Sequence, residues 1–313
     1  MNKKIKIVFA GTPQFAAPYL EGFFNDDDFE VLGVITQPDR PAGRKQELTS
    51  PPIKLLAESK GVKIWQPENL KNDSELFSEL TDLKADVLAV VAYGQIIPKS
   101  ILGLFAYGGI NVHPSLLPKY RGASPIQNAI LNGEKTTGVS IMQMDEKMDH
   151  GPILAQQKVV LTGEETNESL HNDLAQIGVL LLLETIKKVV AGQTLPQEQD
   201  HDAATFCSTI NREQSRIDWQ KPAQEIKQMI YAFYPWPVAW TTLDGQRMKI
   251  YPPVKVINQK NHPGQILADS GEIIVGCGQD SLVIERLQLE GKKDMSAKEL
   301  LNGYKFLLSK KLE

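Results

Sequence analysis

Short apolar runs rich in β-branched residues alternate with helical segments in the first part of this 313-residue chain. Such a run is typical of a strand buried on both faces, and strands that alternate with helices form parallel βαβ units. The pattern therefore predicts an α/β fold with a doubly wound, mostly parallel, Rossmann-like sheet. We expect its first strands at residues 5–10, 31–36, 62–65, 86–92 and 110–113.

Two further apolar runs, at 138–144 and 153–160, follow each other too closely for a helix to lie between them. Consecutive parallel strands need a crossover of about a dozen residues or more, whereas antiparallel strands need only a short turn. The later part of the sheet is therefore expected to turn antiparallel. A long helix is predicted at 167–190, where leucines recur on one side.

The character of the sequence changes after residue 190. Residues 192–202 are polar, contain a Gly and a Pro, and lack periodicity, which is typical of a linker. Beyond them, short strand candidates separated by Asp-Gly, Pro-Gly and Ser-Gly turns indicate a small, OB-like β-barrel. We predict a catalytic domain at 1–190, a linker at 191–206 and a barrel domain at 207–313.

The charge of the chain is unevenly distributed. The formal net charge is −4, with −7 on residues 1–206 and +3 on residues 207–313. An acidic chain argues against bulk nucleic-acid binding, but a mildly basic tail is compatible with a polyanionic partner in that region. A plain solvated surface would fit the same interspersed charges.

Neither a membrane span nor a secretory leader is expected. No apolar run is long enough to cross a bilayer, and the run at 5–10 ends in a Gly-Thr-Pro turn, as a strand does. Cys207 and Cys277 make neither a disulfide framework nor a metal motif. We expect two reduced thiols in a cytoplasmic protein.

Several common site motifs are missing from the sequence. The first strand is not followed by the Gly-x-Gly-x-x-Gly of a dinucleotide site, and the phosphate-binding loop Gly-x-x-x-x-Gly-Lys-Ser/Thr does not occur. No His/Cys cluster has zinc spacing, so we expect no metal. Gly-x-Ser-x-Gly is also absent, which argues against an α/β-hydrolase.

A dense polar stretch at 111–122 follows one of the expected strands, where open α/β sheets place ligand sites. Asn111 and His113 are two residues apart, so in a strand they point to the same face. Pro114 keeps His113 out of the helical region and therefore extended. The sequence thus presents a carboxamide and an imidazole side by side at the edge of the sheet.

A carboxylate that could serve this pair lies in the later loop 142–151, which contains Asp145 and Asp149. A carboxylate aimed at an imidazole fixes its orientation, and an amide together with an imidazolium can donate hydrogen bonds to an oxyanion. No nucleophilic Ser or Cys accompanies them, which favours direct transfer of an acyl group to an incoming nucleophile. The alternative is that Asn111 and His113 are turn and cap residues satisfied locally.

The stretch Asn-Val-His-Pro-Ser-Leu-Leu-Pro-Lys-Tyr-Arg-Gly (111–122) resembles the Ser-Leu-Leu-Pro motif of the formyltetrahydrofolate-dependent formyltransferases. Gly-Val-Ser-Ile-Met-Gln-Met-Asp (138–145) and Met-Asp-His-Gly-Pro-Ile (148–153) resemble a second block of that family. The resemblance spans nearly the whole chain and is strongest to the members that act on methionyl initiator tRNA. Further features carry it: Phe-Ala-Gly-Thr-Pro-Gln-Phe-Ala (9–16), Thr-Gln-Pro-Asp-Arg-Pro-Ala-Gly-Arg (36–44), Val-Val-Ala-Tyr-Gly-Gln-Ile-Ile-Pro (90–98), Arg-Ile-Asp-Trp (216–219) and Phe-Tyr-Pro-Trp-Pro (233–237).

The resemblance implies roles for the site residues. Asn111 and protonated His113 would stabilise the oxyanion that forms when an amine attacks a formyl carbon, while Asp149 would orient His113 and assist proton removal. The loop 37–50 would enter the acceptor stem of the tRNA, with Arg44 and Lys45 as its basic contacts. The residues that resemble the folate-binding stretch are Ser115, Leu116, Leu117 and Pro118.

By the same resemblance, we expect a cytoplasmic monomer that needs no metal. It would move a formyl group from 10-formyltetrahydrofolate, a reduced folate, to the amino group of methionine on initiator tRNA, and its tail would help to bind the tRNA. Two alternatives stay open at this point. One keeps the folate donor and changes the acceptor to an amino-sugar nucleotide, and the other is a nucleic-acid-binding module without activity.

Overall fold

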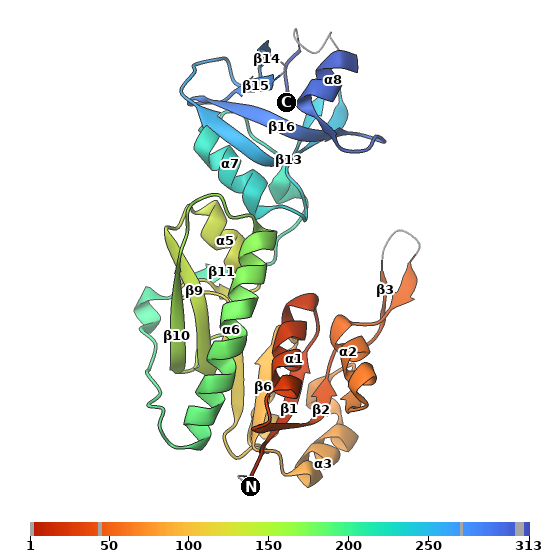
Figure 1. The fold of residues 1–313 in the computed structure, drawn as a ribbon, viewed down its shortest axis with the longest axis vertical. Helices are drawn as coiled ribbons and strands as arrows, with labels where there is room; N and C mark the ends of the chain where they lie inside the picture. Colours follow the sequence, from red (N-terminus) through yellow and green to blue (C-terminus); the bar gives the residue numbers. More distant parts are fainter. Residues whose placement is uncertain (1–2, 43–45, 270–271, 304–309) are drawn as a thin grey trace. The chain divides into compact units, whose positions relative to one another are not determined.

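A computed structural model describes residues 3–42, 46–269, 272–303 and 310–313 of the chain (Figure 1). The chain divides into two compact units. The first comprises Met1–Gly122, Thr137–Val159 and His171–Phe206, and the second comprises Ala123–Thr136, Val160–Leu170 and Cys207–Glu313. Residues 191–206 therefore lie within the first unit, where Gln197 pairs with Ile153.

The first unit is built on a seven-stranded sheet of order β10-β9-β7-β6-β1-β2-β5. The pairs β1·β2, β1·β6, β2·β5 and β6·β7 are parallel, and β7·β9 is antiparallel, so the later part of the sheet turns antiparallel as expected. The strands are β1 (Ile5–Gly11), β2 (Phe29–Ile35), β5 (Lys63–Trp65), β6 (Val87–Val91), β7 (Gly109–His113), β9 (Thr136–Gln143) and β10 (Ile153–Val160).

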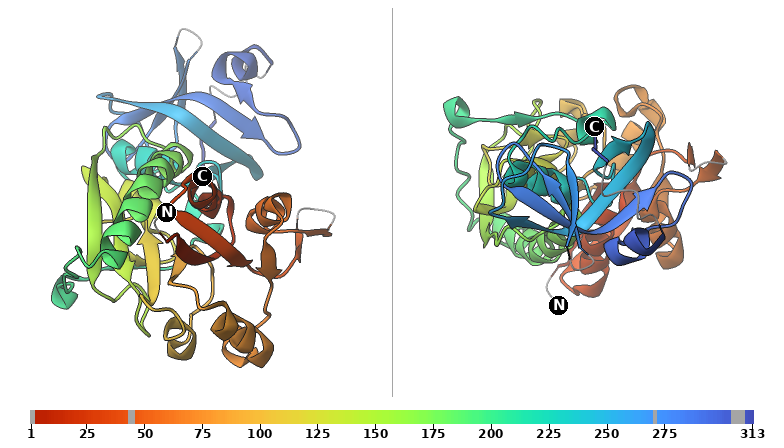
Figure 2. Two further views of the ribbon diagram at one scale, coloured as in Figure 1. Left: turned by 60° about the horizontal axis from the view of Figure 1, so that its bottom comes forward. Right: turned by 90° about the horizontal axis from the view of Figure 1, so that it is seen from above.

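Helices cover both faces of this sheet (Figures 1 and 2). On one face, α1 and α6 lie close together, since a Cβ at Gly178 of α6 would overlap the Tyr19 ring of α1. On the other face, α3 and α4 pack over the core of β1 and β6. The helices are α1 (Ala17–Asn25), α2 (Pro52–Lys60), α3 (Ser74–Leu83), α4 (Lys99–Leu102) and α6 (Asn167–Val190).

The β-branched runs form the buried centre of the sheet because their residues alternate between two covered faces. Val8 and Ala10 of β1 join the core cluster beneath α3 and α4, whereas Phe9 packs edge-on against Phe23 of α1 at 6.1 Å between ring centroids. All five residues of β6 are buried. Each fully buried Val, Leu or Phe side chain among them contributes roughly 1.5–3 kcal/mol relative to exposure.

The chain reverses its direction of travel across the sheet at β1. From β1 it runs outward through β2 to β5, and it then returns to β6 and β7 on the other side of β1. Ligands bind at such a switch point, beyond the carboxyl ends of the strands. The two loops that meet there are joined by the Thr12 hydroxyl, which donates to the Tyr93 carbonyl at 2.9 Å.

The loop predicted at 37–50 contains a β-hairpin that projects from the rest of the first unit (Figures 1 and 2). Its strands are β3 (Arg40–Ala42) and β4 (Glu47–Thr49), which pair antiparallel. Sequence analysis did not predict these strands. Arg44 and Lys45, the predicted tRNA contacts, lie outside the described residues.

The second unit contains an antiparallel sheet of order β12-β13-β16-β15-β14, with β17 paired to β16. This curled sheet confirms the predicted fold class of a Rossmann-like domain followed by a small OB-like barrel. Helix α5 packs against α7 in this unit. Its elements are α5 (Pro125–Leu131), α7 (Ala223–Ala232), β12 (Trp240–Leu243), β13 (Gln246–Ile257), β14 (Ile266–Asp269), β15 (Glu272–Gly276), β16 (Ser281–Leu289), β17 (Met295–Ser296) and α8 (Ala297–Gly303).

Strand β13 is longer than the sequence indicates. The strand candidate in this part of the sequence runs over 246–251, and it is followed by Pro252 and Pro253, which cannot donate ladder hydrogen bonds. In the structure, β13 continues to Ile257, and its register against β16 shifts between Tyr251 and Val254. Because the register shift leaves Pro252 and Pro253 without paired residues on β16, the strand continues past them.

Two further observations concern the helices and one of the two cysteines. Across the described ranges, no helix combines the length and the apolar character needed to cross a bilayer. Cys277 is a buried free thiol, and burial raises its pKa to about 12. That thiol is therefore almost entirely protonated at neutral pH.

Candidate active site

Strand β7 brings Asn111 and His113 to the carboxyl edge of the sheet. The strand lies between β6 and β9, and Asn111 pairs with Val90 on one side and Met142 on the other. A strand held on both sides has little backbone freedom. The expectation that both side chains sit on one face of a strand at the sheet edge is therefore met.

The His113 imidazole is buried and both of its nitrogens face acceptors. Nδ1 lies 3.6 Å from Oδ2 of Asp149, and Nε2 lies 2.9 Å from the Tyr120 carbonyl oxygen. A carbonyl oxygen can only accept, so Nε2 carries the proton in that contact. The imidazole thus has one ring edge toward a carboxylate and the other toward the loop that follows β7.

Asp149 is held in a backbone conformation that few residues adopt. Its φ is +50°, in the left-handed region, and such strain occurs at functional sites where the surroundings over-determine it. The carboxylate accepts the backbone N–H of Gly122 at 2.8 Å through the same Oδ2 that faces His113. The backbone N–H therefore aims this oxygen at the imidazole.

Asn111 presents a carboxamide that the protein does not engage. The residue is half-buried, and no side-chain hydrogen bond joins it to any residue that the structure describes. An amide held at a sheet edge with its donors unused can bind a substrate oxygen. The alternative interpretation, in which the Asn111 side chain is satisfied by a local capping hydrogen bond, does not fit the described residues, because none of them makes such a bond with it.

The stretch Ser115–Pro118 is anchored to β9 by the buried hydroxyl of Ser140. This hydroxyl donates to the Ser115 carbonyl at 2.6 Å and accepts the Leu117 backbone N–H at 3.0 Å. Gln156 of β10 adds a bond from its amide to the Leu117 carbonyl at 2.9 Å. The loop is thus preformed before any ligand arrives.

A glycine on β9 lets this loop lie close to the sheet. A Cβ on Gly138 would stand 2.7 Å from a methyl carbon of Leu116. The Ser115 hydroxyl donates within the loop, to the Lys119 carbonyl at 2.6 Å. The Ser115 hydroxyl therefore serves the backbone of the loop in this structure.

Sequence analysis missed a polar cluster behind Asp149. It contains Arg121 and Gln199, both buried, which hydrogen-bond to each other, and Gln199 also hydrogen-bonds to the Asp149 loop. His150 pairs with Asp145 at 2.6 Å, and its ring stacks on His201 with centroids 4.0 Å apart. Gln199 lies in the segment predicted as a linker, and no periodicity there signals a contact with residues about 50 positions earlier.

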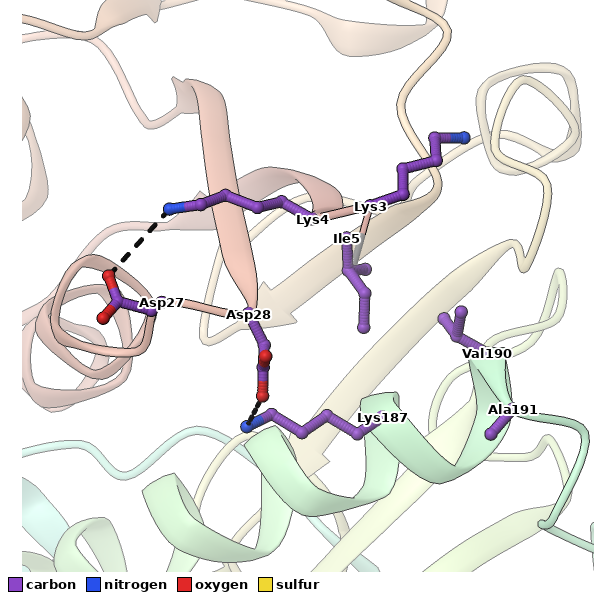
Figure 3. A pocket seen from close by; sticks show the side chains of 8 residues that line it. All are labelled: Lys3, Lys4, Ile5, Asp27, Asp28, Lys187, Val190 and Ala191. Atoms are coloured by element: carbon purple, nitrogen blue, oxygen red, sulfur yellow. Dashed lines mark ion pairs between the residues drawn. The ribbon is translucent and has the colours of Figure 1, made fainter. Parts of the chain in front are cut away.

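A hollow of about 400 Å³ opens at the other edge of the sheet, where β1 and β2 begin (Figure 3). Two of its three lysines point toward acidic partners: Lys187 lies 2.6 Å from Asp28, and Lys4 lies 4.0 Å from Asp27, whereas Lys3 points away from both. The hollow therefore lies at the opposite edge of the sheet from the His113 site. In the described part of the chain, no group of three or more His, Cys, Asp or Glu could hold a metal.

Comparison with known proteins decides the family. The formyl transferase model matches residues 3–186, and the model of the formyl transferase C-terminal domain matches residues 209–305. The chain belongs to the formyl transferase family. The two matches together cover most of the sequence, and the first contains the whole of β7, the loop after it and Asp149.

Curated relatives of this formyl transferase match it almost end to end. Methionyl-tRNA formyltransferase of Caldanaerobacter subterraneus subsp. tengcongensis is 43% identical over 301 residues, which cover 96% of this chain and 97% of that protein. The methionyl-tRNA formyltransferase of Bacillus velezensis is also 43% identical, with coverage of 95% and 94%. The family predicted from the sequence is confirmed.

Solved structures share the fold at low identity. HypX from Aquifex aeolicus in complex with tetrahydrofolic acid is 16% identical with a TM-score of 0.64, over 96% of this formyl transferase. The chain spans about half the length of HypX, 47%. The sugar 3N-formyl transferase WlaRD is 21% identical with a TM-score of 0.66, over 93% of this chain and 100% of that one.

Proposed function

We propose that this enzyme transfers the formyl group of 10-formyltetrahydrofolate to the amino group of methionine on initiator tRNA. The observation that carries the proposal is the His113–Asp149 pair beside the unengaged Asn111 carboxamide. Relatives of more than 40% identity, matched over nearly their full length, are methionyl-tRNA formyltransferases, which supports this acceptor.

The proposed reaction is a direct acyl transfer. The methionine nitrogen attacks the formyl carbon, a C–N bond forms, and the carbonyl oxygen becomes an oxyanion in the tetrahedral intermediate. The bond from carbon to N10 of the folate then breaks. The nitrogen of methionine loses one proton and N10 gains one, so no external oxidant or reductant takes part.

Three side chains have the chemistry for these steps. The Asn111 carboxamide donates to the oxyanion, which is charge stabilisation of the kind that lowers acyl-transfer barriers most. The His113 N–H that bonds the Tyr120 carbonyl in this structure exchanges that acceptor for the oxyanion. The Asp149 carboxylate orients the imidazole and accepts the proton from the attacking amine, directly or through water.

The substrates would occupy the loops at the edge of the sheet. We assign the folate to the stretch Ser115, Leu116, Leu117 and Pro118, whose backbone is preformed by Ser140. We assign the tRNA acceptor stem to the β3–β4 hairpin, with Arg44 and Lys45 as its basic contacts. We propose that the region 1–190 carries the formyl transfer and that the region 207–313 assists tRNA binding.

An amino-sugar nucleotide is the competing acceptor. Solved structures of sugar N-formyl transferases share the fold, but their identity of about 20% carries no information on the acceptor of this chain. The full-length relatives favour the tRNA. The cytoplasmic location and the monomeric state remain predictions. Sedimentation of the purified protein tests the oligomeric state.

The deciding experiment incubates the purified protein with 10-formyltetrahydrofolate and either methionyl initiator tRNA or a dTDP-linked amino sugar. We expect formyl-methionyl-tRNA in the first reaction and no formylated sugar in the second. Absence of formyl-methionyl product overturns the proposal, and product only with the sugar establishes the competing acceptor. Elongator methionyl-tRNA, as a third substrate, tests whether the acceptor stem is read.

A further inference from the structure

The buried side chain of Gln199 bridges two parts of the active-site region. Its amide nitrogen donates to the backbone carbonyls of Asp149 at 3.0 Å and Gly151 at 2.7 Å. Its amide oxygen accepts from Arg121, at 2.6 Å from Nη2 and 3.2 Å from Nε. One side chain thus joins the loop of Asp149 to the short strand that contains Arg121 and Gly122.

The orientation of this amide is determined by its partners. Arg121 has only donors on its guanidinium, so it must face the oxygen of Gln199, and the two carbonyls must face the nitrogen. All the hydrogen-bonding groups of the buried amide are used in this orientation. A buried amide with every group satisfied holds its neighbours firmly, because any displacement leaves a polar atom unpaired.

Consecutive residues of β8 (Arg121–Gly122) therefore restrain Asp149 from two directions. Gly122 donates its backbone N–H to the carboxylate at 2.8 Å, and Arg121 restrains the Asp149 carbonyl through Gln199. Asp149 needs such restraint, because its φ of +50° costs on the order of 1 kcal/mol or more for a residue with a side chain. Without it, the loop would relax toward a commoner conformation.

Arg121 is itself held on its far side. Its Nη2 lies 2.9 Å from Nδ1 of His201, and the His201 ring stacks on His150, which pairs with Asp145. The Arg121 guanidinium thus lies between the Gln199 amide and the His201 ring, and that ring stacks on His150 of the Asp149 loop. The bridge formed by Gln199 therefore ends on the Asp149 loop at one side and on Arg121, itself held by His201, at the other.

We propose that Gln199 is a positioning residue that keeps the Asp149 carboxylate directed at His113. The inference rests on the proposed function, in which this carboxylate takes part in formyl transfer. Gln199 touches neither substrate nor the reacting atoms, and it acts only through the backbone of Asp149. Its loss should therefore slow the chemical step and leave substrate binding nearly unchanged.

The informative substitution is Gln199→Glu. A glutamate beside Arg121 keeps the acceptor and the shape but loses both N–H donors, and its charge repels the carbonyls of Asp149 and Gly151. We expect kcat to fall about tenfold to a hundredfold, as small misplacements of catalytic groups do, while KM for folate and tRNA stays within about twofold. The matched control is Gln197→Glu, which makes the same change at an exposed side chain of the same segment and should leave kcat unaltered.

A double-mutant cycle separates positioning from general damage. In an Asp149→Asn background the Gln199→Glu change should cost less than twofold, because the group that it positions is already gone. An equal loss of kcat in both backgrounds, or a rise in KM without a loss of kcat, would overturn the proposal.

A crystal structure of the Gln199→Glu variant provides a readout that does not need activity. We expect the separation of Asp149 Oδ2 and His113 Nδ1 to lengthen from 3.6 Å and the bond to Gly122 to break. Unchanged distances would refute the positioning role. A wild-type enzyme that forms no formyl-methionyl-tRNA would refute the proposed function instead, and the crystal structure would still decide the role of Gln199.

Discussion

Asp149 and His113, 36 positions apart in the chain, meet with Oδ2 of the carboxylate 3.6 Å from Nδ1 of the imidazole. The distance is longer than a tight hydrogen bond, as is common for catalytic pairs before substrate binds. The same oxygen is fixed by the backbone N–H of Gly122, so the carboxylate has one defined direction.

Asp149→Asn should lower kcat/KM for formyl transfer by about a hundredfold or more, because an amide can neither accept the amine proton nor balance an imidazolium. Steady-state rates with methionyl initiator tRNA measure the effect. The control is Glu146→Gln, an exposed carboxylate of the same loop that pairs with Lys99, which should stay within about twofold of wild type. Equal activity of the two variants would remove Asp149 from the mechanism.

Ser140→Ala should raise KM for the folate by about fivefold to tenfold with a smaller change in kcat. The substitution leaves the Ser115 carbonyl and the Leu117 N–H without their buried partner, which costs roughly 1–3 kcal/mol and loosens the loop. Folate titration and thermal unfolding measure the two consequences. Ser78→Ala, at an exposed position of α3, is the control and should change neither quantity.

Arg247 lies with its guanidinium carbon 4.0 Å from the Trp240 ring, and Arg216 approaches the same ring at 5.7 Å. Both arginines are exposed, so they can meet a phosphate backbone while stacked. Arg247→Ala should weaken tRNA binding and reduce the slope of log K against log salt by about one. Arg247→Lys keeps the charge and should keep most of the slope, and an unchanged slope in the alanine variant would exclude a phosphate contact.

Lys187 of α6 contacts Asp26 at 2.8 Å and Asp28 at 2.6 Å, which joins this helix to the start of β2. Partial burial would raise the pKa of Asp26, but hydrogen bonds from Lys187 and from the Asp28 N–H outweigh it and hold that pKa below its ordinary value of 3.8. Lys187→Met should lower the free energy of unfolding by at most about 1 kcal/mol at pH 7, because the groups are partly exposed.

The sign of the pH dependence follows from the lowered pKa of Asp26. Its contribution to stability is complete above the ordinary value of 3.8 and is lost as the pH falls through the lower folded-state value. The difference between wild type and Lys187→Met should therefore be constant from pH 5 to pH 7, a range chosen to lie well above that ordinary value, and should shrink below it. Denaturant unfolding at several pH values measures it, and a difference that grows in acid would contradict this account.

The sequence by itself determined most of the strands of the sheet and the placement of Asn111 and His113. The buried strands and the helix Asn167–Val190 follow from local periodicity, and the spacing of Asn111 and His113 places them on one face of β7. These features depend on residues within a few positions of each other, so a single chain segment contains the whole signal. The resemblance of residues 148–153 to a motif of the family then indicated Asp149 as the carboxylate of the site.

Only the tertiary structure decided which groups hold that carboxylate. Gly122 and Gln199 reach Asp149 from segments 27 and 50 positions away, and no period or turn rule connects such distances. The length of β13 was hidden for a related reason, since the register shift that takes up its two prolines depends on the partner strand β16. Contacts between distant segments depend on how the whole chain packs, and that packing is what fixes the direction of the Asp149 side chain.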